Sequence, residues 1–278
     1  MKTNIIILLK SPKFIIGLLI IMIITGFILS YPIINKASPI EMVGMSFEEP
    51  SSKHILGTDN FGADVLLKLA YGTRTSVYIG LLAGIFATIL GLIIGLFSGY
   101  LGGIIDNILN SLTNIFIVIP PIIVLILISV SLEKRSTLII AIIIGVTSWP
   151  WTARAIRAQT SSLRHRDHVN IAKISGYTTP KIILFEILPY IASYVFMAFI
   201  IQTAAGILSE AAISMLGLAP ENSITLGLML NWALAFDAIN VEAWWAFLPP
   251  TAIITFLTLS LYLMNAGMDE IFNPKIRS

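Results

Sequence analysis

Two short motifs contain residue types that could carry out chemistry, and neither is complete. Residues 57–62 have the glycine spacing of a phosphate-binding loop, but Ala63-Asp64 follows where Lys-Ser/Thr is required. Residues 165–168 read His-Arg-Asp-His, which includes the His-Arg-Asp of kinase catalytic loops and could also supply metal ligands. No other kinase element accompanies this motif, and its basic surroundings favour a solvated loop. The chain also lacks a Gly-x-Ser-x-Gly elbow and a His-Glu-x-x-His helix. The sequence therefore predicts no catalytic residue and no metal site.

Composition indicates a membrane protein. Of the 278 residues, 56% are hydrophobic and only 12% are charged, whereas soluble domains carry about a quarter charged residues. A net charge of +2 does not suggest a nucleic-acid partner. The chain has no cysteine, which excludes disulfides and thiolate chemistry.

Six apolar runs are long enough to cross a bilayer, for which about 20 residues are needed. The first has no small-residue cleavage site after it, so we expect a permanent helix rather than a signal peptide. Pro120-Pro121 should kink or interrupt the third run, because each proline removes a backbone donor. A further run, 222–236, is short and starts polar, which favours a re-entrant or interfacial segment. The six predicted spans are residues 14–31, 75–105, 107–132, 136–153, 187–209 and 243–268.

The distribution of Lys and Arg predicts that both termini face the cytoplasm. With the N-terminus inside, eleven Lys and Arg residues lie in inside segments and six lie in outside segments. The segment 154–181 alone carries six of the inside residues. A seventh span at 222–236 would place Lys275 and Arg277 outside, which this distribution disfavours.

A stripe of glycines predicts close helix packing in the second span. Their spacings of four and seven residues place all five on one helix face, and small residues allow helix backbones to approach closely in lipid. The contact could be with another helix of this chain or with another subunit. The stripe comprises Gly80, Gly84, Gly91, Gly95 and Gly99.

The predicted spans hold no ionisable residue near mid-membrane, and Asp106 lies at the start of its span. Because such residues are costly in the bilayer and serve as relays in proton-driven carriers, this pattern argues against a self-powered proton-coupled carrier. Sodium coupling through carbonyl and hydroxyl oxygens stays open.

The segment 154–181 is the only sizeable loop predicted on the cytoplasmic side. Val169, Ala172 and Ile174 followed by Gly176 predict a short helix with a glycine cap. A short charged helix between two spans is suited to docking a soluble partner.

This segment resembles the coupling loop of ABC importer permeases, in which a Glu-Ala-Ala tract is followed by a glycine and a Leu-Pro pair. Residues 170–172 read Asn-Ile-Ala where Glu-Ala-Ala is usual. In that family the loop forms a coupling helix seated in a cleft of the ATPase subunit. The resemblance assigns the ATPase-coupling role to Asp167, Asn170, Ala172, Gly176, Leu188 and Pro189.

Further segments are similar to the C-type permease subunit of dipeptide, oligopeptide and nickel importers. Two positions depart from that pattern: Ala63 replaces an arginine, and Leu226 replaces the tryptophan of a Trp-Gly pair. The matching segments are residues 54–64, 71–76, 99–106, 209–218, 244–245 and 273–277.

The resemblance implies an all-α, six-transmembrane-helix ABC importer permease of type I with a cytoplasmic coupling helix. Residues 1–74 would form an N-terminal helix and external segment, and residues 75–278 a five-helix core with its coupling loop at 154–186. Expected partners are a second, B-type permease, two ATPase subunits that use ATP and magnesium, and an extracellular substrate-binding protein. The chain itself would need no cofactor and would lie in a bacterial or archaeal cell membrane.

Peptides are the expected cargo, with nickel or a metal chelate as the alternative for the same kind of complex. A stand-alone channel or ion-coupled carrier is the alternative of a different class. An intramembrane enzyme is a third reading, opposed only by the absence of motifs.

Overall fold

The computed structural model describes residues 11–272, and this part of the chain contains helices but no strand. The expected positions of Lys2, Lys10, Lys275 and Arg277, and the C-terminal match at 273–277, lie outside the described residues. The elements are α2 (Pro12–Ile34), α3 (Val65–Leu101), α4 (Gly103–Val118), α5 (Pro121–Ser131), α6 (Thr137–Leu163), α7 (Asp167–Ile174), α8 (Thr179–Ile182), the π-helix η1 (Ile183–Ile187), α9 (Leu188–Ile213), the π-helix η2 (Ser214–Leu218), α10 (Leu226–Ala235) and α11 (Trp244–Phe272).

Five stretches of helix are long and apolar enough to cross a membrane, and α4 with α5 makes a sixth span if the bent pair counts as one. The axes of α4 and α5 differ by 81° across the break. Ile119 and Pro120 have extended backbone there, and Pro121 begins α5, because a proline fits the first turn of a helix but not its interior. The predicted interruption at Pro120-Pro121 is confirmed. The segment expected to be re-entrant contains α10, a helix of ten residues.

Several helices extend beyond the predicted spans. α3 begins at Val65 rather than residue 75, since the carboxylate of Asp64 caps it by accepting a hydrogen bond from the Leu67 amide at 2.9 Å. The proposed division between residues 74 and 75 therefore falls inside a helix. α6 continues through Arg154 to Leu163, into the segment expected to be a loop. The apolar runs mark the segments suited to the bilayer core, whereas the helices α3 and α6 continue beyond those runs.

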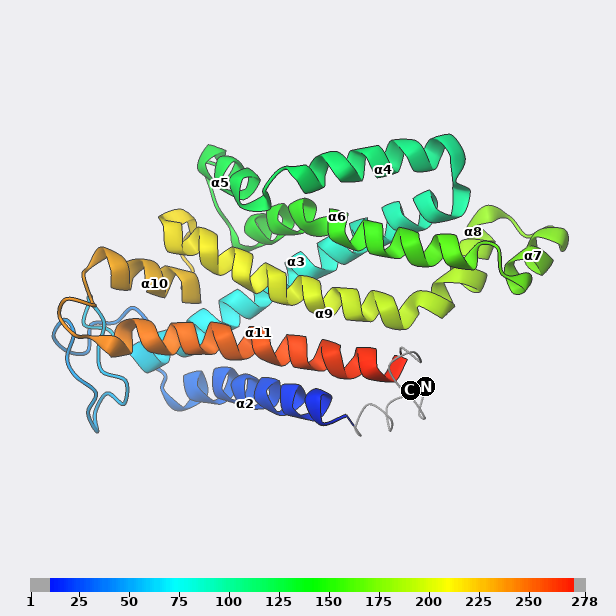
Figure 1. Cartoon of the computed structure of the whole chain (residues 1–278). Coiled ribbons are helices and arrows are strands. Elements are labelled where there is room, and N and C mark those ends of the chain that lie inside the picture. Colours follow the sequence, from blue (N-terminus) through cyan, green and yellow to red (C-terminus); the bar gives the residue numbers. More distant parts are fainter. Residues whose placement is uncertain (1–10, 273–278) are drawn as a thin grey trace.

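Figure 1 shows the helices as a bundle of roughly aligned elements with two distinct ends. α7 and α8 project at one end, where α2 begins and α11 finishes. The segment 35–64 and α10 lie at the opposite end. α2 packs along α11, and Lys13 pairs with Glu270 near the α7 end.

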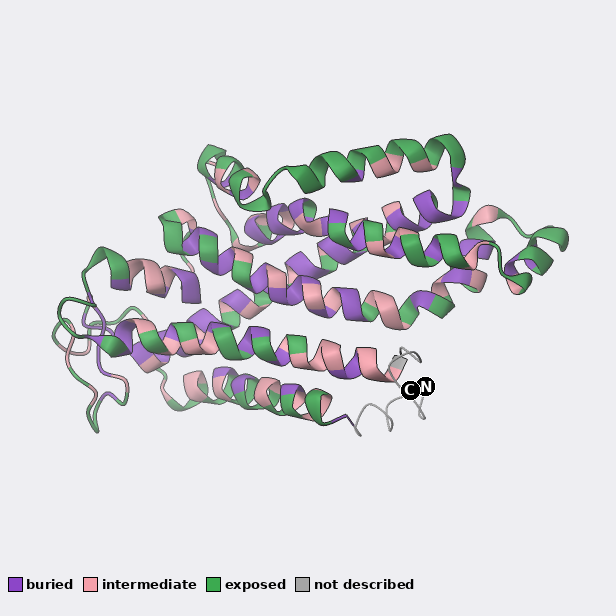
Figure 2. Cartoon of the chain, viewed as in Figure 1, coloured by how far each residue is buried: buried purple, intermediate pink, exposed green. Residues whose placement is uncertain are grey.

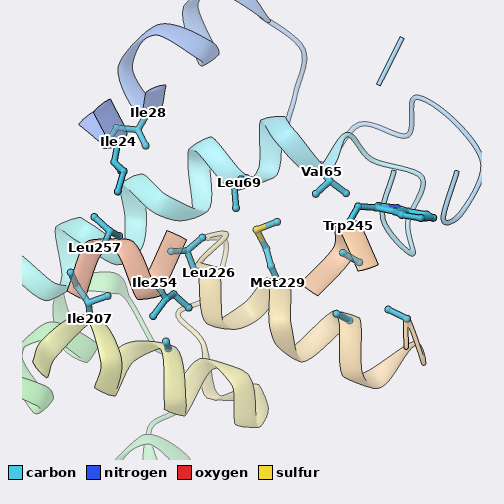
Figure 3. Packing of buried hydrophobic residues seen from close by; sticks show 14 of the residues in the cluster. Ile24, Ile28, Val65, Leu69, Ile207, Leu226, Met229, Trp245, Ile254 and Leu257 are labelled. Carbon is cyan, nitrogen blue, oxygen red and sulfur yellow. The ribbon is translucent and has the colours of Figure 1, made fainter. Parts of the chain in front are cut away.

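Burial follows α3, α6 and α9, whereas α2, α4 and α5 are mostly exposed (Figure 2). At the α10 end, one apolar cluster joins five helices (Figure 3). Leu69 of α3, Ile207 of α9 and Met229 of α10 belong to it, together with Leu257 of α11 and Ile28 of α2. The short helix α10 is therefore part of the packed core, although it does not cross the bundle.

Candidate coupling element and translocation cavity

The helix α7 has an apolar side and a charged side. Asp167 lies in its first turn and Lys173 in its last, which are the favourable ends of the helix dipole for these charges. Val169 and Ala172, three residues apart, are buried on the same face. We call residues 167–182, which span α7 and α8, the coupling element.

The buried face of α7 belongs to an apolar cluster that includes the ends of three long helices. Val169 and Ala172 share one apolar cluster with Tyr100 of α3, Ile156 of α6 and Ile187 at the foot of α9. α7 lies mainly against η1 and α8, and the shared apolar cluster connects it to α3, α6 and α9.

His168 fixes the start of α7 to the foot of α9. Its Nε2 lies 3.2 Å from the backbone oxygen of Glu186, and its ring stacks on Tyr190 with the centroids 4.5 Å apart. The expectation that both histidines face solvent is correct for the exposed His165 and wrong for His168. Within residues 11–272, no three His, Asp or Glu side chains are grouped so that they could hold a metal ion.

A glycine ends α7 in a left-handed conformation. Gly176 has φ +78°, and the amide of Gly176 donates to the oxygen of Lys173 at 3.1 Å. The Tyr177 amide donates to the oxygen of Ala172 at 3.0 Å. This pair of bonds is the Schellman arrangement, in which glycine avoids the steric cost of a positive φ. The turn reverses the chain toward α8.

The Leu188-Pro189 pair coincides with a local change of helix type. The amide of Leu188 donates to the oxygen of Ile183, five residues back, and Pro189 follows in the first turn of α9. Because Pro189 has no amide proton, the normal bond to Phe185 cannot form. The π-helix η1 accommodates this irregular hydrogen bonding where the coupling element joins α9.

The residues assigned to coupling divide into two groups. Ala172 is buried within the chain and Leu188 is half-buried, so they face the bundle. The coupling role that the resemblance assigns to these two residues stays a prediction. The apolar residues that α7 presents outward are Ile171 and Ile174, with 63% and 87% of their surface exposed. The remaining assigned residues, Asp167, Asn170, Gly176 and Pro189, are also exposed.

All five stripe glycines are buried on α3, and they face two different helices of the same chain. A Cβ added to Gly84 would lie 2.5 Å from Thr203 Oγ1 of α9, and Gly80 faces the same helix at Ile207. The other three face α6. A Cβ at Gly91 would lie 2.5 Å from Thr152 Cβ, and one at Gly99 would lie 2.7 Å from the oxygen of Arg157. Close packing by this stripe therefore occurs within the chain.

A cavity of about 450 Å³ lies between α4, α5, α6 and α9. α6 contributes three polar or charged side chains, one proline and one tryptophan to it, and α9 contributes two polar and two apolar side chains. The lining residues are Phe116, Ile117, Pro121, Thr147, Ser148, Pro150, Trp151, Arg154, Ile201, Gln202, Ala205 and Ser209. We call this the α4–α9 cavity.

Polar contacts tie the walls of the α4–α9 cavity together. The side-chain amide of Gln202 donates to the Ser148 oxygen at 2.8 Å and to Thr152 Oγ1 at 2.7 Å, which joins α9 to α6. Arg154 Nη2 donates to Asn114 Oδ1 at 2.9 Å, which joins α6 to α4. These bonds connect polar side chains of α4, α6 and α9 around the cavity.

A bidentate ion pair closes the α7 end of α4 against α6. Arg157 Nε and Nη2 donate to the two carboxylate oxygens of Asp106 at 2.6 and 2.7 Å. Ser98 of α3 also donates to Asp106. Sequence reasoning missed this pair because residues 51 positions apart carry no periodic signal.

Two buried charged residues occur in α3 and α9, toward the end of the bundle away from α7. The predicted spans contained no charged residue at these positions. Glu210 is fully buried in α9 and accepts hydrogen bonds from Ser76 at 2.7 Å and Ser214 at 2.6 Å. Lys68 is buried in α3 and pairs with Asp59 of the preceding segment. These groups join the segment 35–64 and the long helices rather than forming a relay along the bundle.

The fold and site define a multi-pass helical protein that combines a projecting helical element with a cavity between its spans that carries a few polar side chains. The model of the binding-protein-dependent transport system inner membrane component matches residues 91–278. The chain belongs to this family, and it is accordingly a transport subunit rather than an enzyme.

Curated relatives cover nearly the whole chain. A putative peptide transport system permease protein of Brucella suis biovar 1 is 30% identical over 97% of this chain and 90% of its own length. The dipeptide transport system permease protein DppC of Haemophilus influenzae is 30% identical over 94% of this chain and 90% of its own length. DppC of Bacillus subtilis is 29% identical over 86% of this chain and 76% of its own length.

Proposed function

We propose that this chain is the permease subunit of an ATP-driven peptide importer and forms half of its translocation path. The packing of α7 carries this proposal. Val169 and Ala172 on its buried face share one apolar cluster with residues of three spanning helices, while Ile171 and Ile174 remain exposed at the end of the bundle. A solvent-exposed apolar patch beside charged residues supports docking of a soluble partner.

The relatives favour peptides as the cargo, since those cited above are named for peptide or dipeptide transport. Nickel is not needed to account for any feature of the described residues. The expected complex contains a second permease, two ATPase subunits that bind ATP and magnesium, and an external substrate-binding protein. The coupling element would face the cytoplasm, in agreement with the six Lys and Arg residues of the segment 154–181, in a bacterial or archaeal cell membrane.

Copurification and reconstitution test this function. The chain, expressed with its genomic neighbours, should copurify with ATPase subunits, and the reconstituted complex should import peptides only with ATP and the binding protein. A stand-alone channel or ion-coupled carrier would instead transport without ATPase subunits. Peptide-stimulated ATPase activity that is absent from every such preparation would contradict the proposal.

A further inference from the structure

Arg154 is the one basic residue of the α4–α9 cavity lining, and its exposed side chain makes a single hydrogen bond within the protein. Its guanidinium carries five N–H donors, and the structure shows one protein hydrogen bond, to Asn114. Among residues 11–272, no carboxylate lies within ion-pair distance of Arg154.

Arg157, three residues further along α6, provides an internal comparison. It points to α4 as well, but Asp106 occupies it with a bidentate pair. The chain therefore supplies a carboxylate to one of two neighbouring arginines and leaves the other open to the cavity. Asn114 holds the open guanidinium in place without neutralising it.

The surroundings of Arg154 suit an amphipathic ligand rather than a lipid headgroup. Trp151 and Phe116 line the same cavity and offer apolar contact area. Ser148 and Gln202 add polar groups to the lining on α6 and α9. A surface that contacts only lipid chains would be expected to carry apolar residues at these positions. A largely apolar cavity with a few convergent polar groups is typical of ligand sites.

We propose that Arg154 is a subsite for the free carboxylate of a peptide passing through the α4–α9 cavity. This inference rests on the function proposed above. Arginine binds carboxylates through two parallel N–H donors, and a peptide's C-terminus presents that group beside apolar side chains. Asn114 acts as a positioning residue that orients the guanidinium.

The test compares an apolar tripeptide with its C-terminal amide in the complete complex, reconstituted in liposomes. We expect Arg154→Gln to lower the ratio of acid uptake to amide uptake by about tenfold or more, since hydrogen bonds to charged groups are worth about 1.5–3 kcal/mol. Arg154→Lys keeps the charge without the two parallel N–H donors and should give an intermediate ratio of acid uptake to amide uptake. Lys134→Gln, which removes an exposed cation outside the cavity, should leave the ratio unchanged.

The binding protein is the same in every arm, so its own preference for free acids cancels from the comparison. An unchanged ratio in Arg154→Gln, or an equal fall in uptake of both peptides, would overturn the subsite while leaving the importer function intact. A fall in the ratio that occurs in phospholipid vesicles but disappears in vesicles of uncharged, phosphate-free glycolipid would assign Arg154 to lipid phosphate and also overturn it. A wild-type complex that imports neither peptide would contradict the importer function itself.

Discussion

Replacement of Gly95 by leucine should force α3 and α6 apart. A Cβ at this position would lie 2.7 Å from the backbone oxygen of Ala153 and 2.7 Å from Ile156 Cβ. Real side chains do not approach so closely, and the backbone oxygen cannot rotate away, so the two helices must separate along their contact.

The expected cost follows from a matched substitution elsewhere in the chain. Gly26 of α2 is also helical and exposed, and an added Cβ would meet nothing within 4 Å. Both substitutions gain about 1 kcal/mol of helix propensity, which cancels when they are compared. Overpacking in a well-packed interior costs about 1–3 kcal/mol, or more where backbone must move. At about 2–4 °C per kcal/mol, Gly95→Leu should melt roughly 2–12 °C below Gly26→Leu.

Thermal stability of the purified subunit in one detergent, followed by size-exclusion chromatography after heating, measures this difference. Yield of the assembled complex should fall in Gly95→Leu and stay normal in Gly26→Leu. Equal melting temperatures and equal yields for the two variants would refute the argument that the stripe sets the distance between α3 and α6.

The other predictions concern the coupling element and the topology. Gly176→Val should reduce ATPase-coupled uptake in the reconstituted complex, because a β-branched residue tolerates φ +78° poorly. Gly176→Asn should retain most of the uptake. Equal uptake in both variants would argue against a requirement for the left-handed conformation at residue 176. Ile174→Arg should leave the permease subunit stable but weaken its copurification with ATPase subunits. Ala172→Arg should instead lower the stability of the permease subunit by about 2 kcal/mol or more, since Ala172 is buried within the chain. The reverse pattern would show that α7 docks by its other face. In this cysteine-free chain, Ser52→Cys should react with an impermeant reagent on intact cells and Ser162→Cys only after permeabilisation; the opposite result would invert the topology.

Much of the fold is readable from the sequence because lipid imposes simple constraints. Apolar runs of about 20 residues predict the spans. Two adjacent prolines predict the break after α4, and a short run that begins with polar residues predicts that α10 does not span the bilayer. The ends of the helices were less accurate, since hydropathy reports where lipid ends and not where hydrogen bonding ends. The N-terminal cap at Asp64 and the continuation of α6 past Arg154 leave no hydropathic signal.

The orientation of individual side chains was harder to predict than the elements that carry them. A helix of eight residues has room for two or three inward positions, and composition alone does not say whether an alanine faces its own bundle or a partner. Ala172 faces its own bundle, and Ile174 is the more exposed apolar residue. His168 looked like part of a solvated basic run, yet it packs on Tyr190, 22 residues later. Such contacts depend on the turn at Gly176, which returns the chain to the foot of α9.

The contacts of the coupling element indicate how movement at α7 would reach the α4–α9 cavity. Residues of α7 share one apolar cluster with residues of α3, α6 and α9. The glycine stripe lets the backbone of α3 approach α6 and α9 closely, so we expect α3, α6 and α9 to move as one body. The opposite wall, α4 and α5, contributes few buried residues and is interrupted by an 81° bend. Segments with few buried contacts yield most easily. We therefore expect motion of α7 to change the width of the cavity between the α6–α9 wall and the α4–α5 wall, with the pair Asp106–Arg157 acting as the pivot at the α7 end.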